Sequence, residues 1–195
     1  MSPARLETFA DGVFAIAATL LILDVRSPLG EPFRQAWPSY VAYVVSFVTI
    51  GIMWINHDQI IRMIDRTDRR FVLFNLGLLM CIAFVPFPTR LMAEHIRREG
   101  AQTAALAYGF TLTVTAIFFD AVWLYAKHGQ RLLRPETDPK VVSGITRTYL
   151  PGPWIYLAAT LVAFASPSAS AVLYLAIAGL YVAESSIFGG GTTSN

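Results

Sequence analysis

The sequence contains few charged residues and almost no cysteine. Charged side chains make up 14% of the 195 residues, and Cys81 is the one cysteine. Soluble domains carry about 25% charged residues. This shortage, together with 55% hydrophobic residues and a mean hydropathy of +0.52, indicates a membrane protein with several spans. A single cysteine excludes a disulfide framework, and the net charge of +2 is too small to suggest a nucleic-acid partner.

Sequence motifs of common enzymes and metal sites are also missing. The chain has no His-Glu-x-x-His, no Gly-x-Ser-x-Gly, no phosphate-binding Walker loop and no Cys-x-x-Cys. The three histidines, His57, His95 and His128, lie in different segments. His95 follows Glu94, but two adjacent ligand types are a weak metal signal. We therefore expect no enzymatic activity and no cofactor.

Six apolar segments are long enough, or nearly so, to cross a membrane. A transmembrane helix needs about 20 mainly apolar residues. The segments are residues 6–25, 37–57, 71–92, 104–126, 149–165 and 168–185. Prolines interrupt the third segment late and stand near the start of the fifth. We predict an all-α membrane protein with six transmembrane helices, forming a single domain over residues 1–188 that is followed by a flexible tail, 189–195.

Lysine and arginine are distributed unequally between the two ends of these predicted helices. Ten of the 15 lie at the N-terminus or in the loops after the second and fourth helices, and five lie in the opposite loops. Cytoplasmic loops carry the excess of positive charge in membrane proteins. We therefore predict a multi-pass protein of the cell membrane whose two termini are both cytoplasmic.

The first apolar segment carries a carboxylate, Asp11, near its start. A charge so close to hydrocarbon is costly unless it has a partner or a function. At about 100° per residue, Asp11 lies about 140° around the helix from Ile16. The Ile16 side of the helix carries a stripe that consists of Gly12, Ile16, Thr19, Leu20 and Leu23. From periodicity alone, such a stripe indicates a lipid-facing surface or core packing. The wheel thus separates a mostly aliphatic stripe from an acid that we expect to be buried against neighbouring helices.

The same segment resembles a known signature. Residues 5–11, Arg-Leu-Glu-Thr-Phe-Ala-Asp, are similar to Arg-x-x-x-Phe-Ser-Asp, which opens the first helix of the TMEM175-type potassium channels; Ala10 replaces the usual serine. In that family the first helices of four subunits line a central fourfold pore, whose narrowest points are bulky aliphatic side chains. The resemblance implies a homotetrameric channel that conducts potassium ions with modest preference over sodium.

The resemblance also gives the stripe its roles. Counting from the motif aspartate carries the first hydrophobic constriction onto Ile16 and further layers onto Leu20 and Leu23. The threonine layer that the family links to potassium preference falls on Thr19. An apolar constriction excludes water and blocks ions until it widens, and K⁺ gives up its hydration shell more readily than Na⁺. We therefore expect K⁺ to pass transiently close to Ile16 and Thr19.

A second group of residues resembles the polar network of the family. Trp54 and His57 share a helix face at spacing i, i+3 and are similar to the family's Trp-x-x-His motif. Asn75 stands in a segment that resembles the third helix. Together with Arg5 and Asp11 they form a predicted structural network. The network is either a clamp that holds the first helix against the second and third or a pH sensor, since histidine titrates near neutrality; the wheel favours the clamp.

Three alternatives to a potassium channel remain open. A proton channel would use the same constriction, but its currents would follow the proton gradient. A proton-coupled transporter would place its acid against a water-filled cavity, although the sequence lacks an inverted repeat and paired broken helices. A non-conducting membrane scaffold would be indifferent to substitution of Ile16. One further acid, Asp120, lies late in the fourth segment, too far from Lys127 for a neat ion pair.

Overall fold

The computed structural model describes residues 2–25 and 33–188, and all the elements within them are helices. The predicted tail, 189–195, lies outside the described residues. The elements are α1 (Pro3–Leu20), the 3-10 helix η1 (Leu21–Asp24), α2 (Phe33–Arg62), α3 (Arg69–Phe84), α4 (Pro86–His95), α5 (Ala101–Lys127), the 3-10 turn η2 (His128–Gln130), α6 (Pro139–Tyr149), α7 (Gly152–Val162) and α8 (Pro167–Phe188).

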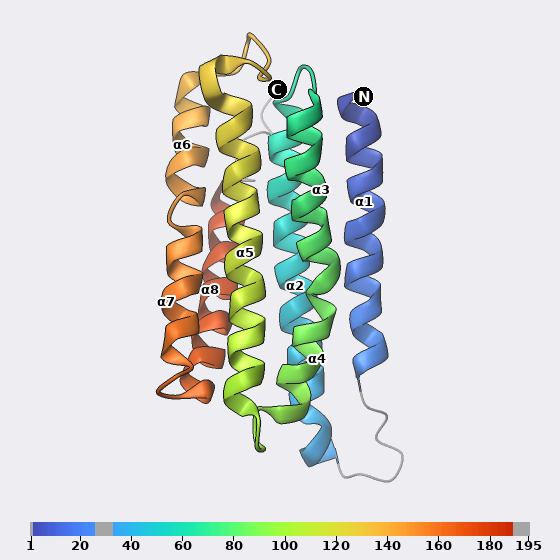
Figure 1. Cartoon of the computed structure of the whole chain (residues 1–195), viewed down its shortest axis with the longest axis vertical. Helices are drawn as coiled ribbons and strands as arrows, with labels where there is room; N and C mark the ends of the chain where they lie inside the picture. Colours follow the sequence, from blue (N-terminus) through green and yellow to red (C-terminus); the bar gives the residue numbers. More distant parts are fainter. Residues whose placement is uncertain (1, 26–32, 189–195) are drawn as a thin grey trace.

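The helices stand side by side in an upright bundle (Figure 1). α3 and α4 stack end to end as one column, and α6 and α7 form another. With each stack counted once, the described residues hold six helical columns, so the predicted all-α fold with six helices is confirmed. Four of the columns are long and apolar enough to cross a membrane, and α8 adds a shorter apolar stretch, Pro167–Tyr181.

Prolines divide the two stacked columns. α4 starts at Pro86, where proline lacks the N–H that would continue the α3 ladder. Pro151 similarly separates α6 from α7. The predicted fifth span, 149–165, is therefore only partly right: α7 covers Gly152–Val162, and α6 stacks on it where we expected a loop. α6 is amphipathic, with Val142 and Ile145 packed against the core, which a search for apolar runs does not detect.

α5 lies at the centre of the bundle and α1 at its edge. α5 packs against α3, α4, α7 and α8, whereas α1 packs mainly against α2 and α3. Buried hydroxyl groups link the central helices: Ser46 Oγ lies 2.9 Å from Thr89 Oγ1 and 3.4 Å from the Tyr108 hydroxyl oxygen. Interhelical hydrogen bonds of this kind help to hold helices together where no water is present.

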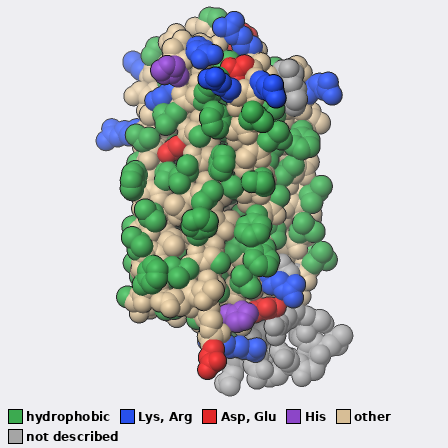
Figure 2. All heavy atoms as spheres, in the orientation of Figure 1, with side chains coloured by type: hydrophobic (Ala, Val, Ile, Leu, Met, Phe, Trp, Pro, Cys, Tyr) green, Lys and Arg blue, Asp and Glu red, His purple; other side chains and the backbone are tan. Residues whose placement is uncertain are grey.

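The surface of the bundle is apolar at mid-height. On the face shown in Figure 2, hydrophobic side chains cover the middle, and most charged side chains gather at the two ends. The start of α1 and the α2–α3 and α5–α6 connections lie together at one end (Figure 1). These are the three regions that the predicted orientation puts on one side of the membrane. The exterior therefore has the pattern of a protein that crosses a bilayer.

Candidate ion pathway along the first helix

α1 has one face packed into the bundle and one face left open. The packed face repeats every three or four residues, as an α-helix requires, and consists of Leu6, Ala10, Phe14, Ala17 and Leu21. The predicted stripe lies on the open face: Ile16 is 61% exposed, Leu20 42% and Leu23 76%. Gly12 is open as well, since a Cβ added there would meet nothing within 4 Å. No described part of the chain covers this apolar stripe.

The open stripe continues beyond the end of the α-helix. α1 ends at Leu20 and the chain goes on as the 3-10 helix η1. A 3-10 helix has three residues per turn, so side chains at i and i+3 eclipse each other. Leu23 therefore lies one turn along from Leu20 on nearly the same line. The change of helix type keeps the aliphatic side chains in register along the open face.

Thr19 is exposed on the same face and its hydroxyl group is already oriented. It donates a hydrogen bond to the backbone carbonyl of Ile16 at 3.0 Å. A hydroxyl group has one hydrogen to donate and two lone pairs that accept. Because the hydrogen is used within the helix, the Thr19 oxygen keeps its acceptor capacity, which is the property that a dehydrating cation needs.

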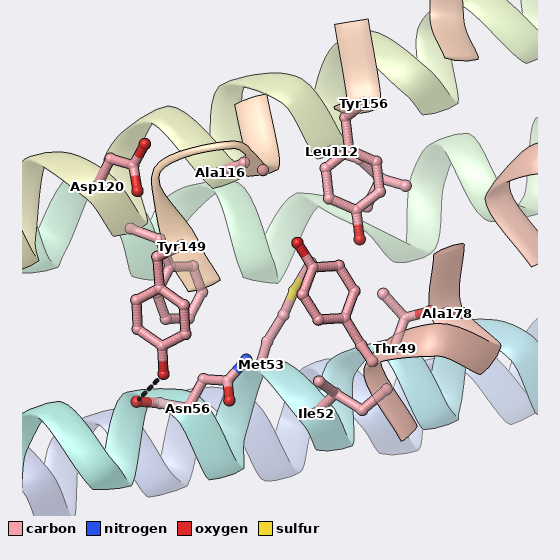
Figure 3. A pocket seen from close by; sticks show the side chains of 13 residues that line it. Thr49, Ile52, Met53, Asn56, Leu112, Ala116, Asp120, Tyr149, Tyr156 and Ala178 are labelled. Atoms are coloured by element: carbon pink, nitrogen blue, oxygen red, sulfur yellow. Dashed lines mark hydrogen bonds between the residues drawn. The ribbon is translucent and has the colours of Figure 1, made fainter. Parts of the chain in front are cut away.

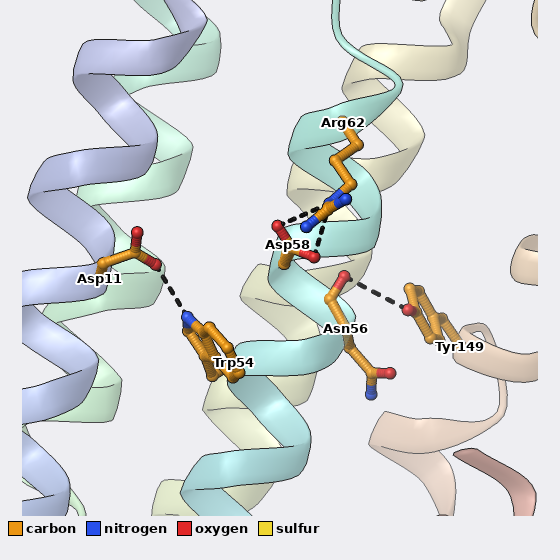
Figure 4. Close-up of polar contacts among 6 residues, drawn as sticks. All are labelled: Asp11, Trp54, Asn56, Asp58, Arg62 and Tyr149. Atoms are coloured by element: carbon orange, nitrogen blue, oxygen red, sulfur yellow. Dashed lines mark hydrogen bonds and ion pairs between the residues drawn. The ribbon is translucent and has the colours of Figure 1, made fainter. Parts of the chain in front are cut away.

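The Asp11 carboxylate is hydrogen-bonded to the second helix. Trp54 on α2 donates its indole N–H to Asp11 Oδ1 at 2.8 Å (Figure 4). Asp11 and Trp54 are both exposed in the single chain, so the expectation of a buried acid is not met within one subunit. This hydrogen bond joins Asp11 to the Trp-x-x-His segment and fastens α1 to α2 from the outside.

His57 forms a second, buried contact. Its Nε2 lies 3.1 Å from Asn75 Oδ1 on α3, and the two residues are 2% and 0% exposed. The ring of Phe14 on α1 packs on the His57 ring with centroids 5.4 Å apart. The sequence analysis did not identify Phe14, although it lies on the packed face of α1. This contact holds the inner side of α1 against the α2–α3 pair.

The predicted network is therefore divided into two pairs. Asp11 pairs with Trp54 and His57 with Asn75, and among the described residues no hydrogen bond joins the two pairs. Arg5 is exposed at the start of α1 and joins neither. Asn75 Nδ2 is the one buried side-chain nitrogen or oxygen in the described part of the chain without a hydrogen-bond partner.

The polar residues beside Trp54 on α2 face other partners. Asp58 accepts from Arg62 Nε at 2.8 and 2.9 Å, and the backbone carbonyl of Asn56 accepts from the Tyr149 hydroxyl group at 3.5 Å (Figure 4). Asp58 thus forms an ion pair with the exposed Arg62 on the same helix. In the described residues no three His, Cys, Asp or Glu side chains gather where they could hold a metal ion.

Comparisons with known proteins show which family this chain resembles. Residues 5–86 match the sequence profile of a family described as the endosomal/lysosomal potassium channel TMEM175. A potassium channel of Chamaesiphon minutus is 41% identical over 171 residues, which cover 83% of this chain and 84% of the relative. The endosomal/lysosomal proton channel TMEM175 of Gallus gallus is 32% identical over 152 residues, covering 69% of this chain and 30% of the relative.

One solved structure extends the likeness to nearly the whole fold. The crystal structure of a lysosomal potassium-selective channel TMEM175 homolog from Chamaesiphon minutus superposes with a TM-score of 0.84 at 35% sequence identity. The alignment covers 94% of this chain and 97% of that chain. The similarity therefore includes α4 to α8, where the sequence motifs are thin.

Proposed function

The chain belongs to the TMEM175 family of ion channels, and on that premise we propose that it conducts K⁺ in modest preference to Na⁺ through a pore lined by the first helices of four subunits. Its membership makes it a multi-pass membrane channel and not an enzyme. The observation that carries the proposal is the open stripe of α1. This stripe is apolar, continuous, and uncovered by any described part of its own subunit.

The stripe has the chemistry of a hydrophobic constriction. Aliphatic side chains such as Ile16 offer an ion no ligand, so a narrow ring of them loses its water and blocks flow until it widens. Thr19 supplies an oxygen on the same face, with its hydrogen directed to the backbone. We assign the constriction to Ile16, Leu20 and Leu23, and the potassium preference to Thr19, near which K⁺ passes transiently.

The exposure of Asp11 supports a homotetramer. Asp11 stands eight residues after the start of α1, about 12 Å along the helix at 1.5 Å per residue. In a single subunit surrounded by lipid, this exposed carboxylate would face hydrocarbon at considerable cost. An assembly in which four copies of α1 surround an axis removes the acid and Thr19 from lipid together. Closed cyclic symmetry is the usual way to build such an assembly.

We propose that the two polar pairs act as a clamp. The Asp11–Trp54 and His57–Asn75 contacts hold α1 from its outer and inner sides, and neither pair lies on the aliphatic stripe. As a pH sensor, His57 would have to titrate while packed against Phe14 at 2% exposure, where charging an imidazole is costly. The clamp therefore explains the geometry better than the sensor does.

Cation flux into liposomes tests the proposal. Ile16→Asn places an amide in each of the four proposed ring positions, which should lower the barrier to ion passage. A barrier lower by about 1.4 kcal/mol raises the leak about tenfold. Thr19→Ala should reduce the ratio of K⁺ to Na⁺ flux. Ile117→Asn is the matched control, because Ile117 is 51% exposed on α5 and lies outside the stripe. Normal flux and selectivity in both α1 variants would contradict the assignment.

A proton channel is the second candidate, because the Gallus gallus relative carries that name. The same liposomes distinguish the two activities if a proton gradient is imposed without a K⁺ gradient. Flux that follows the proton gradient alone would favour the proton channel. Saturable uptake would instead indicate a proton-coupled transporter.

We further propose that residues 1–188 act as one channel domain in the cell membrane with both termini in the cytoplasm. The excess of Lys and Arg at the end of the bundle that holds the start of α1 supports this orientation. A protease added outside intact cells should spare a tag fused to the N-terminus and should cleave a site introduced between α4 and α5.

A further inference from the structure

A groove of about 280 Å³ runs between α2, α4, α5 and α8. It begins near the start of α2 and the α4–α5 connection, which lie at the same end of the bundle (Figure 1). Along α2 its lining extends from Trp37 to Ser46, which is about 14 Å of helix at 1.5 Å per residue. None of the described residues that line it belongs to α1, so the groove is separate from the proposed pore.

The groove is mainly apolar and open along one side. Val41 on α2 and Val172 on α8 line it and are exposed. The hydroxyl groups on its buried floor are already hydrogen-bonded: Ser46 Oγ lies 2.9 Å from Thr89 Oγ1, and the Tyr174 hydroxyl group donates to a backbone carbonyl on α5 at 3.2 Å. Water needs two or more polar partners to settle in such a space. The body of the groove therefore suits a hydrocarbon chain better than water.

A single charged side chain stands at the end of this apolar lining. Arg97, just after α4, is the one charged side chain among the described residues that line the groove. Its guanidinium carbon lies 4.9 Å from the centre of the Trp37 ring on α2, and it forms no ion pair with a described residue. The ring contact orients the guanidinium, whose five N–H donors suit a phosphate or carboxylate.

The position of Arg97 and Trp37 indicates where the ligand comes from. Tryptophan and arginine gather where a spanning helix meets the lipid headgroups, and both residues lie at an end of the bundle, beyond its apolar middle. A phospholipid places a phosphate at that level and hydrocarbon below it. A soluble anion would reach Arg97 but leave the apolar groove unfilled. A bilayer lipid satisfies the charge and the apolar walls together.

We propose that this groove binds one anionic phospholipid of the surrounding bilayer. The lipid phosphate accepts hydrogen bonds from Arg97, and an acyl chain lies between Val41 and Val172. A zwitterionic lipid is disfavoured, because its own ammonium group would come close to the guanidinium, whereas basic pockets between spanning helices attract anionic headgroups. The bound lipid joins α2, α4 and α8 without contacting the α1 stripe.

Native mass spectrometry of the purified, assembled protein tests the proposal. The protein is titrated with dioleoyl phosphatidylglycerol, which is anionic, and with dioleoyl phosphatidylcholine, which has the same chains and no net charge. We expect tighter, saturable binding of phosphatidylglycerol. Arg97→Gln should weaken that binding about fivefold, the contribution of one basic residue near the membrane surface. Arg98→Gln is the matched control, because Arg98 is exposed and does not line the groove.

A second variant tests the apolar part of the groove. Ala171→Phe on α8 places a ring among the lining residues and should weaken the binding of both lipids by several-fold. Ala169→Phe, at an exposed position of the same helix outside the lining, should bind both lipids normally. If Ala171→Phe does not fold, the comparison of Arg97→Gln with Arg98→Gln decides alone.

Four outcomes would overturn the proposal. They are equal affinity for the two lipids, equal losses in Arg97→Gln and Arg98→Gln, normal binding by folded Ala171→Phe, and full competition by glycerol 3-phosphate, which carries the phosphate without chains. A changed oligomeric state of Ala171→Phe with normal lipid binding would show that a second copy of the chain covers the groove. Lipid binding is measured without a cation gradient, so its result does not depend on the proposed channel function.

Discussion

Replacing Gly109 by alanine should loosen the contact of α5 with α7 and α8. A Cβ at this position would overlap the Tyr174 hydroxyl oxygen and Thr160 Oγ1. Both oxygens are held in place, because the Tyr174 hydroxyl group lies 3.2 Å from the Ala105 carbonyl oxygen and 3.3 Å from Thr160 Oγ1. The added methyl group therefore either pushes the helices apart or displaces the Tyr174 side chain from its hydrogen bonds.

The expected loss follows from three terms. Overpacking a tight contact costs about 1–3 kcal/mol, and a lost hydrogen bond costs about 1 kcal/mol more. The better helix propensity of alanine returns up to about 1 kcal/mol. The free energy of unfolding of Gly109→Ala should therefore fall by about 1–3 kcal/mol.

Reversible unfolding in mixed detergent micelles, followed by circular dichroism, measures this change. Gly179→Ala on α8 is the control, because nothing lies within 4 Å of its added Cβ, and it should be neutral or slightly stabilising. Unaltered stability of Gly109→Ala, or an equal loss in Gly179→Ala, would refute the reasoning.

Two further predictions concern single polar contacts. Trp54→Phe removes the N–H that Asp11 accepts at 2.8 Å and should lower the free energy of unfolding by about 1 kcal/mol without altering the ratio of K⁺ to Na⁺ flux; changed selectivity at unchanged stability would argue against a clamp. The Phe71 backbone N–H, then the Tyr125 hydroxyl group and Arg131, hold the pKa of Asp68 below its ordinary value. Because the folded pKa is depressed, this stabilisation is present above about pH 4 and is lost as pH falls through the folded pKa. Asp68→Asn, which keeps a helix-capping side chain, should therefore lower the thermal midpoint at pH 7, and the difference should disappear in acid; a difference that persists at low pH would contradict the charge effect.

The length and spacing of the apolar runs were sufficient to predict the columns of the fold. A run of about 20 apolar residues has few options other than a spanning helix, and the prolines marked where α4 and α7 begin. α6 was missed because Lys140 and Arg147 stand on its exposed face and lower its mean hydropathy. Its amphipathic pattern, with Val142 and Ile145 one turn apart, was the signal that could have identified it.

The polar residues of α1 to α3 were predictable as a group, but their pairing was not. Asp11, Trp54, His57 and Asn75 stand out because each is polar or amphipathic in an apolar segment. Whether they form one network or two pairs depends on how each helix is rotated about its axis, which a single sequence does not specify. The cavity of about 60 Å³ beside Asp120 (Figure 3) was beyond prediction for a related reason, since its walls come from α2, α5, α6, α7 and α8, and these meet only in the folded bundle.

α2 lies between the Asp11–Trp54 contact and the cavity that Asn56 lines. Trp54 and Asn56 are two residues apart, about 200° around the helix, so they point to opposite sides of one turn. Trp54 reaches Asp11 on α1, while Asn56 faces Tyr149 and the cavity (Figure 4). A ligand that tilted or rotated this turn would move the indole that holds α1.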